Sequence, residues 1–582
     1  MQKYGELLKT LFEKRGILTE TEADIFINPD YRRDLHDPFL MRDMERSCVR
    51  LHKAVENKEK IIIYADYDCD GIPGAVILSD LFKKIDHKNY EVYIPQRNSE
   101  GYGLNLDVLK RFAESGVKLL ITVDLGITAV AEVAQASTLG VDVIITDHHL
   151  PKTSSAENFL GSSEEGQPDQ LENSLPTSAF ILPRAYAILN PKIDEYEEKM
   201  LCGAGVVFKF VQGFIKKYGQ GNKQFKIKDG MEKWMLDMAG LATLSDMVPL
   251  VGENRTLAHF GMKVLKKSPR PGLQKLLVKM NIDQRYLSED DIGFMVTPRL
   301  NAASRMDDPM RAFELLATAD EIEGSRLADH LSKINDERKT MVTSIMREVN
   351  KKFEKRKITE VIVIGNPNWR VGVLGLIAGK ISDVYKKPVF VWGKDENDCI
   401  KGSCRSDGSV SVVELMAETR ESFIDFGGHE LAGGFTVQKD KIHFLEEALS
   451  ANFNKVKRNP RASLRQENYD MKLILENVNM KNWREIEKLA PFGFGNPKPI
   501  FLFENVKIEK IKKFGKNGSG EHLEIIFSDK NNNKAKAISF FSSVNSFKNI
   551  LTEGLAVNLL ATFDLSRFRG REELRLRIID IP

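Results

Sequence analysis

Between residues 60 and 146, short apolar runs alternate with longer stretches whose apolar positions recur at helical spacing. The runs have the length of buried strands, and the stretches between them have the period of amphipathic helices. The pattern predicts strands at 60–65, 91–95, 118–123 and 141–146, and helices at 73–84, 106–115 and 129–139. This alternation is typical of a parallel sheet covered by helices.

The flanking regions predict other elements. Residues 1–58 carry helical patterns broken by turns, which predict a helical N-terminal lead-in. Residues from about 309 to 355 predict one long charged helix, and an apolar run at 361–365 opens a second α/β lobe. From about residue 462, runs of period two at 523–527, 535–541 and 556–563 predict a small β-barrel.

The predicted fold class is therefore α/β, with an added barrel. A parallel-sheet domain at 59–305 and a second α/β lobe at 357–457 are joined by the helix within 306–356, and the barrel occupies 462–582. Residues 153–179 are polar, and their apolar positions follow neither the helical nor the strand period, so they predict a disordered surface insertion.

Composition narrows the class of protein only slightly. The chain has 582 residues, of which 42% are hydrophobic and 29% charged, and its net charge is +2. Binding to a nucleic acid would therefore depend on local basic surface. The five cysteines are odd in number and lack C-x-x-C spacing, which argues against a disulfide framework and a zinc site. With no run of 18 apolar residues, we expect a soluble cytoplasmic protein.

The strand at 60–65 runs directly into three aspartates at alternate positions, Asp66, Asp68 and Asp70, followed by Gly71. Alternate carboxylates can converge on one hard cation, so the stretch favours a divalent-metal site over a solvated acidic turn. A calcium loop has the same beginning but requires Glu at its twelfth position, where this chain has Ile77, and it follows a helix rather than a strand.

Other predicted strands also end in groups that could bind metals or phosphates. Arg97 and Glu100 follow the second strand, Asp124 ends the third, and Asp147, His148 and His149 end the fourth. The carboxyl ends of parallel strands meet at one edge of a sheet, so we expect these groups to lie together. Carboxylates with imidazoles suit Mn²⁺ or Mg²⁺, and a pair of ions about 3.5–4 Å apart is a usual device for phosphodiester hydrolysis.

Eleven stretches carry a resemblance to a known family. They are DYDCDG, PQRNSEGYGLN, VDLGIT, TDHHLP, LCGAGVVFK, GLATLSDMVPL, PRLNAASR, NWRVGVLGLIAGK, GSCRS, GGHELAGGF and PFGFGNPKP. In this order they resemble the motifs of the DHH phosphoesterase superfamily, and most closely its RecJ family of single-strand-specific DNA exonucleases. The resemblance covers nearly the whole chain, and its C-terminal part is similar to the oligonucleotide-binding (OB) barrel of that family. The chain departs from the family at Arg370-Val371, where a His-Glu pair is usual, and in the 153–179 insertion.

The resemblance implies an exonuclease of DNA repair and recombination that degrades single-stranded DNA from 5′ to 3′ and releases mononucleotides. It implies two ions, Mn²⁺ or Mg²⁺, held by Asp68, Asp70, Asp124, His148 and Asp246, with Asp66, Asp147 and His149 as further ligands or orienting groups. The residues that it implies for substrate binding are Arg97, Tyr102, Asn301, Arg305, Arg370, Ser403, Arg405, Gly427, Gly428, His429, Arg567, Arg569 and Arg571.

Two other functions stay open at this point. Phosphodiesterases of short oligonucleotides or cyclic dinucleotides use the same metal edge, and some relatives in replication complexes act as non-catalytic DNA-binding scaffolds. For the exonuclease, we expect a monomer that receives its strand from a helicase and a single-strand-binding protein and that has no contact with a membrane.

Overall fold

The computed structural model describes residues 1–97, 100–153, 180–219, 225, 227–228, 230–354, 356–456, 469–515, 522–567 and 572–582. These residues form two compact units. The larger unit comprises His36–Val248 and Phe260–Leu464, and the smaller unit comprises Met1–Leu35, Pro249–His259 and Arg465–Pro582. The 153–179 prediction lies outside the described residues, apart from Thr153 at its edge.

The first sheet of the larger unit is entirely parallel, with strand order β2-β1-β3-β4-β7. Its strands are β1 (Lys60–Ala65), β2 (Tyr90–Tyr93), β3 (Val117–Val123), β4 (Asp142–Thr146) and β7 (Ala187–Leu189). The helices between the strands are α4 (Gly71–Lys84), α5 (Leu106–Glu114) and α6 (Val130–Thr138). The predicted alternation of strands and helices is thus confirmed, and the fourth crossover adds β7 with the short pair β5 (Lys152–Thr153) and β6 (Phe180–Ile181).

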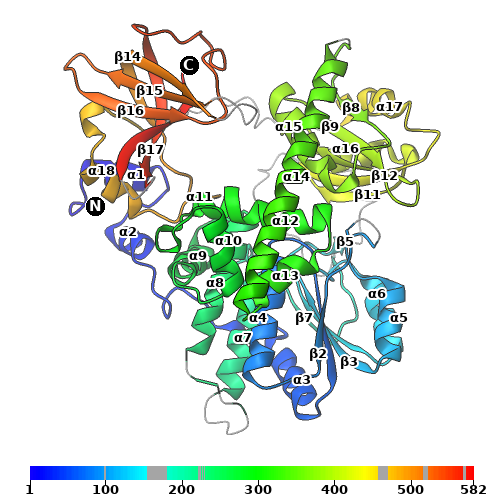
Figure 1. The fold of residues 1–582 in the computed structure, drawn as a ribbon. Helices are drawn as coiled ribbons and strands as arrows, with labels where there is room; N and C mark the ends of the chain where they lie inside the picture. The colour runs from blue at the N-terminus through cyan, green and yellow to red at the C-terminus, as the bar shows by residue number, and fades with distance from the viewer. Residues whose placement is uncertain are drawn as a thin grey trace, which may run out of the picture. The chain divides into compact units, whose positions relative to one another are not determined.

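Helix α4 is buried nearly all around, because it packs between the sheet and other helices (Figure 1). A Cβ on Gly74 would lie 2.5 Å from Val123 Cγ1, so the glycine lets the helix approach β3 closely. The remaining helices of this region are α3 (Met44–Glu56), α7 (Gly203–Tyr218), α8 (Leu236–Ser245), α10 (Pro271–Lys279), α11 (Glu289–Asp291) and α12 (Thr297–Met306). Helix α9 (Gly252–Leu265) is divided, since its residues up to His259 belong to the smaller unit.

The predicted single helix at about 309–355 is wrong in its first part, since the structure has two helices there. Helix α13 (Met310–Ala317) ends before Thr318, and α14 (Glu321–Phe353) begins after Asp320. The Asp320 carboxylate accepts hydrogen bonds from the backbone N–H groups of Ile322 and Glu323, which makes it an N-cap. The apolar spacing continues across this break, so hydrophobic periodicity alone did not reveal the cap.

The second sheet of the larger unit has strand order β11-β12-β10-β9-β8, with only β8 and β9 parallel. Its elements are β8 (Ile362–Gly365), α15 (Val371–Tyr385), β9 (Val389–Lys394), β10 (Ile400–Arg405), α16 (Val412–Glu418), β11 (Phe423–His429), β12 (Ala432–Val437) and α17 (Leu445–Asn452). The C-terminal half of α14 packs into this lobe, where Val342, Ile345 and Val349 join the core against α15. Helix α14 therefore belongs to both α/β regions.

The smaller unit contains a closed barrel. Its order is β14-β15-β16-β18-β17, and β17 pairs back to β14. The strands are β13 (Met471–Lys472), which pairs with β14 outside the ring, β14 (Phe501–Phe514), β15 (His522–Ser528), β16 (Lys534–Ser539), β17 (Ala556–Ser566) and β18 (Glu573–Asp580). The helices α1 (Glu6–Glu13), α2 (Glu20–Ile27) and α18 (Met480–Glu487) belong to the same unit. The predicted barrel is confirmed.

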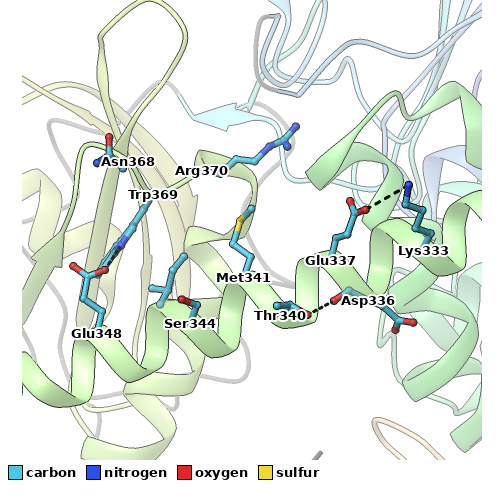
Figure 2. Close-up of a pocket in the computed structure, with 11 residues that line it drawn as sticks. Lys333, Asp336, Glu337, Thr340, Met341, Ser344, Glu348, Asn368, Trp369 and Arg370 are labelled. Atoms are coloured by element: carbon cyan, nitrogen blue, oxygen red, sulfur yellow. Dashed lines mark hydrogen bonds and ion pairs between the residues drawn. The ribbon is translucent and has the colours of Figure 1, made fainter. Parts of the chain in front are cut away.

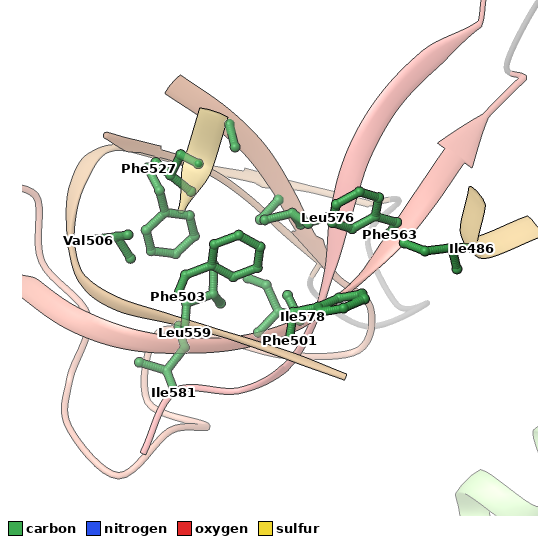
Figure 3. Close-up of a cluster of buried hydrophobic side chains, with 14 of the residues drawn as sticks. Ile486, Phe501, Phe503, Val506, Phe527, Leu559, Phe563, Leu576, Ile578 and Ile581 are labelled. Carbon is green, nitrogen blue, oxygen red and sulfur yellow. The ribbon is translucent and has the colours of Figure 1, made fainter. Parts of the chain in front are cut away.

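The interior of the barrel is filled by aromatic and branched side chains, among them Phe501, Phe503, Phe527 and Phe563 (Figure 3). Phe563 is only 6% exposed, so its ring packs in the interior and offers no stacking face to unpaired bases. Inward and outward positions alternate along a strand, and Phe563 occupies an inward one. Across the described ranges of the chain, no helix is apolar for a length that would span a bilayer.

Candidate metal centre and phosphate-binding groups

The turn after β1 brings its three aspartates to the carboxyl edge of the sheet. The Asp68 carboxylate accepts hydrogen bonds from the backbone N–H groups of Asp70 (2.9 Å) and Gly71 (3.2 Å), which fixes the turn. A Cβ on Gly71 would lie 2.5 Å from the backbone oxygen of Asp66, so only glycine fits here. The turn is thus held rigidly before any ligand binds.

Asp70 is anchored by a different element. Its two carboxylate oxygens accept hydrogen bonds from the backbone N–H groups of Gly203 (2.6 Å) and Ala204 (2.7 Å), at the N-terminus of α7. Free N–H groups and the helix dipole both favour a negative charge at this position. The stretch LCGAGVVFK contributes these contacts, and its functional role was not apparent from its residue types.

Asp124 directly follows β3 and has a strained backbone conformation, with φ at 60°. It is 2% exposed, and its Oδ1 atom accepts no hydrogen bond from the described residues. The Oδ1 atom of Asp66 is likewise buried without a hydrogen bond from them. A buried carboxylate oxygen without a donor is costly unless a cation neutralises it, so these two atoms fit metal ligands.

Asp147 differs from Asp66 and Asp124, because both of its carboxylate oxygens accept hydrogen bonds. Its Oδ1 accepts hydrogen bonds from the backbone N–H groups of His148 (2.7 Å) and His149 (3.1 Å) and lies 2.8 Å from His149 Nδ1. Its Oδ2 accepts one from the backbone N–H of Ile127 (2.9 Å). Asp147 therefore holds the backbone of both histidines and orients the ring of His149 through Nδ1, which leaves Nε2 of that ring for another ligand.

The strand-end groups converge as the sequence predicted. Three sets of three residues each offer one ligand atom within 4.8 Å of the others, and these sets are Asp66, Asp68 and Asp124; Asp124, His148 and His149; and Asp70, His148 and Asp246. His148 Nε2 lies 3.2 Å from Asp124 Oδ1, 3.7 Å from Asp70 Oδ2 and 3.8 Å from Asp246 Oδ2. Asp124 and His148 each belong to two sets, so the geometry suits two neighbouring ions that share ligands.

The electrostatics of this edge also favour cations. Burial, followed by repulsion from neighbouring aspartates, raises the pKa of Asp70 to about 7 and that of Asp246 to about 9, and it raises those of Asp66 and Asp124 as well. Burial lowers the pKa of His148 to about 3, which keeps this imidazole neutral and able to bind a metal. Oxygen ligands with neutral imidazole suit Mn²⁺ and Mg²⁺.

Asp147 and His149 shift each other's pKa values. Burial lowers the pKa of His149, but the hydrogen bond and charge of Asp147 outweigh it and raise this pKa to about 9. Burial would raise the pKa of Asp147, but the His149 hydrogen bond lowers it to about 2. The side-chain amide of Asn190 also donates to the backbone oxygen of His149 (2.8 Å), a contact that the sequence did not suggest.

Arginines form a second cluster in the larger unit. Arg305 is partly buried, and burial followed by the charges of Arg97, Arg338 and Arg405 lowers its pKa to about 9. Arg305 Nη1 donates to the backbone oxygen of Gly372 (3.0 Å) in the first turn of α15. A Cβ on Gly375 would lie 3.1 Å from both Arg405 Nη2 and Ser403 Oγ. These guanidinium, hydroxyl and helix N-terminal groups form a site of the kind that binds phosphate.

The other candidate substrate-binding residues of the larger unit are Tyr102, Asn301, Gly427, Gly428 and His429, and they come from different parts of the chain. Tyr102 donates to the backbone oxygen of Asp124 (3.4 Å), and the rings of His429 and His149 lie 6.2 Å apart. Gly428 has φ at 142°, and a Cβ there would lie 2.3 Å from the backbone oxygen of Ala432. On Gly427 a Cβ would meet no described atom within 4 Å, and Asn301 Oδ1 on α12 is buried without a described partner.

Arg370 makes a structural contact. Its Nη2 donates to the backbone oxygen of Met306 (2.8 Å), which ties the start of α15 to the end of α12. It also lines a shallow groove of about 740 Å³ along α14, together with Trp369 and Glu348 (Figure 2). Trp369 Nε1 donates to Glu348 (3.1 Å), so this end of the groove fixes α14 to the second lobe. A phosphate-binding role for Arg370 stays a proposal.

Two arginines of the barrel in the smaller unit form internal ion pairs. Arg567 pairs with Glu572 (3.0 Å) and Arg575 with Asp564 (2.6 Å), while Arg569 and Arg571 lie outside the described residues. Sequence reasoning missed an aromatic cluster on the same barrel, formed by Phe514, His522, Phe540 and Phe541. Phe541 is 78% exposed and lies just beyond β16, which ends at Ser539.

Family models match three parts of the chain. Residues 60–168 match the N-terminal domain of the DHH family, residues 355–455 match the DHHA1 domain, and residues 469–580 match the RecJ OB domain. A parallel sheet that collects aspartates and a His-His pair at its carboxyl edge, next to a DHHA1 lobe, defines a DHH-family protein.

Whole-chain relatives narrow the family further. The single-stranded-DNA-specific exonuclease RecJ of Bacillus subtilis (strain 168) is 31% identical over 99% of this chain and 67% of its own length. RecJ of Haemophilus influenzae is 26% identical over 98% of this chain and 95% of its own length. The crystal structure of Thermus thermophilus RecJ in complex with Mn²⁺ has the same fold, with a TM-score of 0.78 and 22% identity over 100% of this chain and 76% of the other. The chain belongs to the RecJ family.

Proposed function

We propose that the protein is a metal-dependent exonuclease that degrades single-stranded DNA from 5′ to 3′, releases mononucleotides, and acts in DNA repair and recombination. The observation that carries the proposal is the convergence of Asp66, Asp68, Asp70, Asp124, His148, His149 and Asp246 at one sheet edge, in a chain of the RecJ family. In this proposal, residues 59–305 carry the metal centre, 357–457 bind the substrate, and 462–582 hold the strand.

The donor set supports a choice of metal ligands. Asp68, Asp70, Asp124, His148 and Asp246 would hold two ions, either Mn²⁺ or Mg²⁺, and the unsatisfied oxygen of Asp66 and the ring of His149 complete the set. When bound, such an ion pair lowers the pKa of water and stabilises the departing oxygen of a phosphodiester. Asp147 would keep the His149 imidazole oriented through Nδ1, and it holds the backbone N–H groups of both histidines.

The arginine cluster would bind the phosphate groups of the strand. Arg305 and Arg405 would neutralise charge on the phosphate oxygens, and Ser403 would donate a hydrogen bond to the same group. The rings of His149, which follows β4, and of His429, on β11, lie 6.2 Å apart, so both α/β regions of the larger unit would contribute to the substrate site. A helicase and a single-strand-binding protein would deliver this strand to a monomer in the cytoplasm.

End-labelled DNA tests the proposal directly. With Mn²⁺ or Mg²⁺, the protein should convert a single strand to mononucleotides from the 5′ end and leave a blunt duplex intact. Asp124→Asn should reduce this rate by about 10²-fold or more, because the shared ligand loses its charge. Asp107→Asn is a matched control, since this carboxylate is 89% exposed on α5. Undiminished degradation by Asp124→Asn would refute the proposed site.

The same assay separates the two other functions. A phosphodiesterase of dinucleotides would cleave short substrates and leave long strands, whereas the barrel of this chain favours long ones. A non-catalytic scaffold would bind DNA without cleaving it under any metal condition, and the complete set of carboxylate and imidazole ligands argues against this function.

A further inference from the structure

Helix α14 carries an arginine in the middle of its buried face. Leu327, Leu331 and Ile334 are buried on the N-terminal half of the helix, and Val342 and Ile345 are buried on the C-terminal half. Arg338 lies on the same face, at the helical spacing that joins the two apolar halves. An apolar residue would continue the stripe here, so the guanidinium interrupts a surface that is otherwise built for packing.

The surroundings of Arg338 are positively charged. Burial, followed by the charge of Arg299, lowers the pKa of Arg338, and Arg338 in turn helps to lower that of Arg305. Arg299 and Arg305 both lie on α12, which packs against α14. Asp336 is the only carboxylate that acts on Arg338 or Arg299 among the described groups, and its side chain is 70% exposed.

Arg299, Arg305 and Arg338 have few partners among the residues that the structure describes. None of the three forms an ion pair with a described carboxylate, and the Nε atoms of Arg299 and Arg338 are buried without a hydrogen-bond partner among the described residues. Asn335, one turn before Arg338, has both atoms of its amide buried and likewise unpaired. Buried charge without a counter-charge is destabilising, so such an arrangement suggests an anion that is supplied from outside.

We propose that Arg338, supported by Arg299, binds a phosphate of the DNA strand next to the phosphate held by Arg305. This inference rests on the proposed function and adds a residue to its substrate site. Because Arg305 lies within electrostatic reach of Arg97, Arg338 and Arg405, the positive track extends from the metal-bearing region onto α14. Arg338 is a positioning residue here, since it holds the strand away from the reacting bond.

Salt-dependent binding distinguishes a phosphate contact from a packing role. Affinity for an oligothymidine is measured without metal ion, so that the strand is not cut, at several salt concentrations. Arg338→Gln should bind about tenfold more weakly, and the slope of log affinity against log salt should become shallower by about 0.7, the effect of one lost phosphate contact on a single strand. Arg338→Lys should restore most of this slope because it keeps the charge.

Arg347→Gln is the matched control, because this arginine is exposed on the same helix and should leave the slope unchanged. If Arg338→Gln lowers only the melting temperature and keeps the wild-type slope, Arg338 has a packing role and the inference is refuted. Should Arg338→Gln fail to fold, protection of Arg338 from an arginine-specific reagent is measured in the wild-type protein. Oligothymidine should protect it, and modification at an unchanged rate would also refute the inference.

Failure of the Arg338 inference can be distinguished from failure of the proposed exonuclease function. A wild-type protein that neither binds nor degrades single strands would refute the function itself. A wild-type protein that degrades single strands, with an Arg338→Gln slope equal to the wild-type slope, would refute only the role of Arg338.

Discussion

A Cβ added to Gly203 would lie 2.5 Å from the Cβ of Asp124 and 2.7 Å from its Oδ1. The first turn of α7 therefore touches the strained aspartate that two of the candidate ligand sets share. The same turn donates its N–H groups to Asp70. One glycine thus sets the distance between two strand-end carboxylates, and its substitution is a sensitive test of the metal centre.

Gly203→Ala should displace Asp124 and reduce nuclease activity by about 10²-fold, since a shift of about 1 Å in a reacting group has an effect of this size. Gly205→Ala is the matched control, because it lies in the same turn and a Cβ there meets Cys202 Sγ at an ordinary 3.5 Å. Cleavage rates and circular dichroism are measured for both. Equal activity of the two variants would show that nuclease activity does not depend on the present position of Asp124.

Asp147→Asn tests the orienting role of this side chain. The substitution keeps the size of the group but removes the charge that holds His149, so Mn²⁺ affinity should fall roughly 10- to 100-fold. Calorimetric titration of the metal-free protein measures the change. An affinity like that of the wild type would mean that the histidines are oriented by their packing alone.

The raised carboxyl pKa values predict how stability and metal affinity depend on pH. Burial and neighbouring aspartates raise the pKa of Asp70 to about 7 and that of Asp246 to about 9. The folded, metal-free protein therefore keeps protons that the unfolded chain has lost, and the stability from these protonated groups is lost as the pH rises through these values. Between about pH 5 and pH 8 its melting temperature should fall, whereas Mn²⁺ affinity should rise because fewer protons compete for the ligands.

Calorimetry at several pH values, with and without Mn²⁺, checks both trends. The stabilisation by Mn²⁺ should be larger at the higher pH. Asp124→Asn protein serves as the control, since it lacks one raised carboxyl and should show a smaller change with pH. Metal affinity that falls as the pH rises would contradict the assigned ligands.

The sequence predicted those site residues that come directly after the strands of the parallel sheet. Asp66, Asp124 and Asp147 each follow an apolar run, and parallel pairing places the ends of such runs at one edge. Asp246 was different, because it is the C-cap of α8 and no local pattern related it to the sheet. The N-terminus of α7 was missed for a similar reason, since its contribution comes from backbone N–H groups rather than from side-chain chemistry.

The barrel shows a second limit of sequence reasoning. Strand periodicity predicted its strands, but it did not tell which of the arginines would be paired or which rings would face inward. Phe563 has an aromatic ring that could stack on a base, but it is buried. Phe541 was predicted to lie in the strand at 535–541, but that strand ends at Ser539 and Phe541 is exposed beyond it. Which aromatic rings stay exposed depends on where each strand stops, and strand ends are set by pairing with neighbours.

Phe541→Ala tests the aromatic cluster as a base-stacking surface. Phe541 is held at φ 56°, an unusual conformation for a bulky residue, and its N–H donates to His522 Nδ1 (2.9 Å). Stacking of a base on an aromatic ring contributes about 1–3 kcal/mol. The variant should bind long single strands at least about fivefold more weakly, while its cleavage rate on substrates too short to reach the barrel should stay unchanged. Ile550→Ala removes another exposed apolar side chain of the same unit, 67% exposed, and should affect neither property. If the two variants bind long strands equally well, the exposed rings do not hold the DNA.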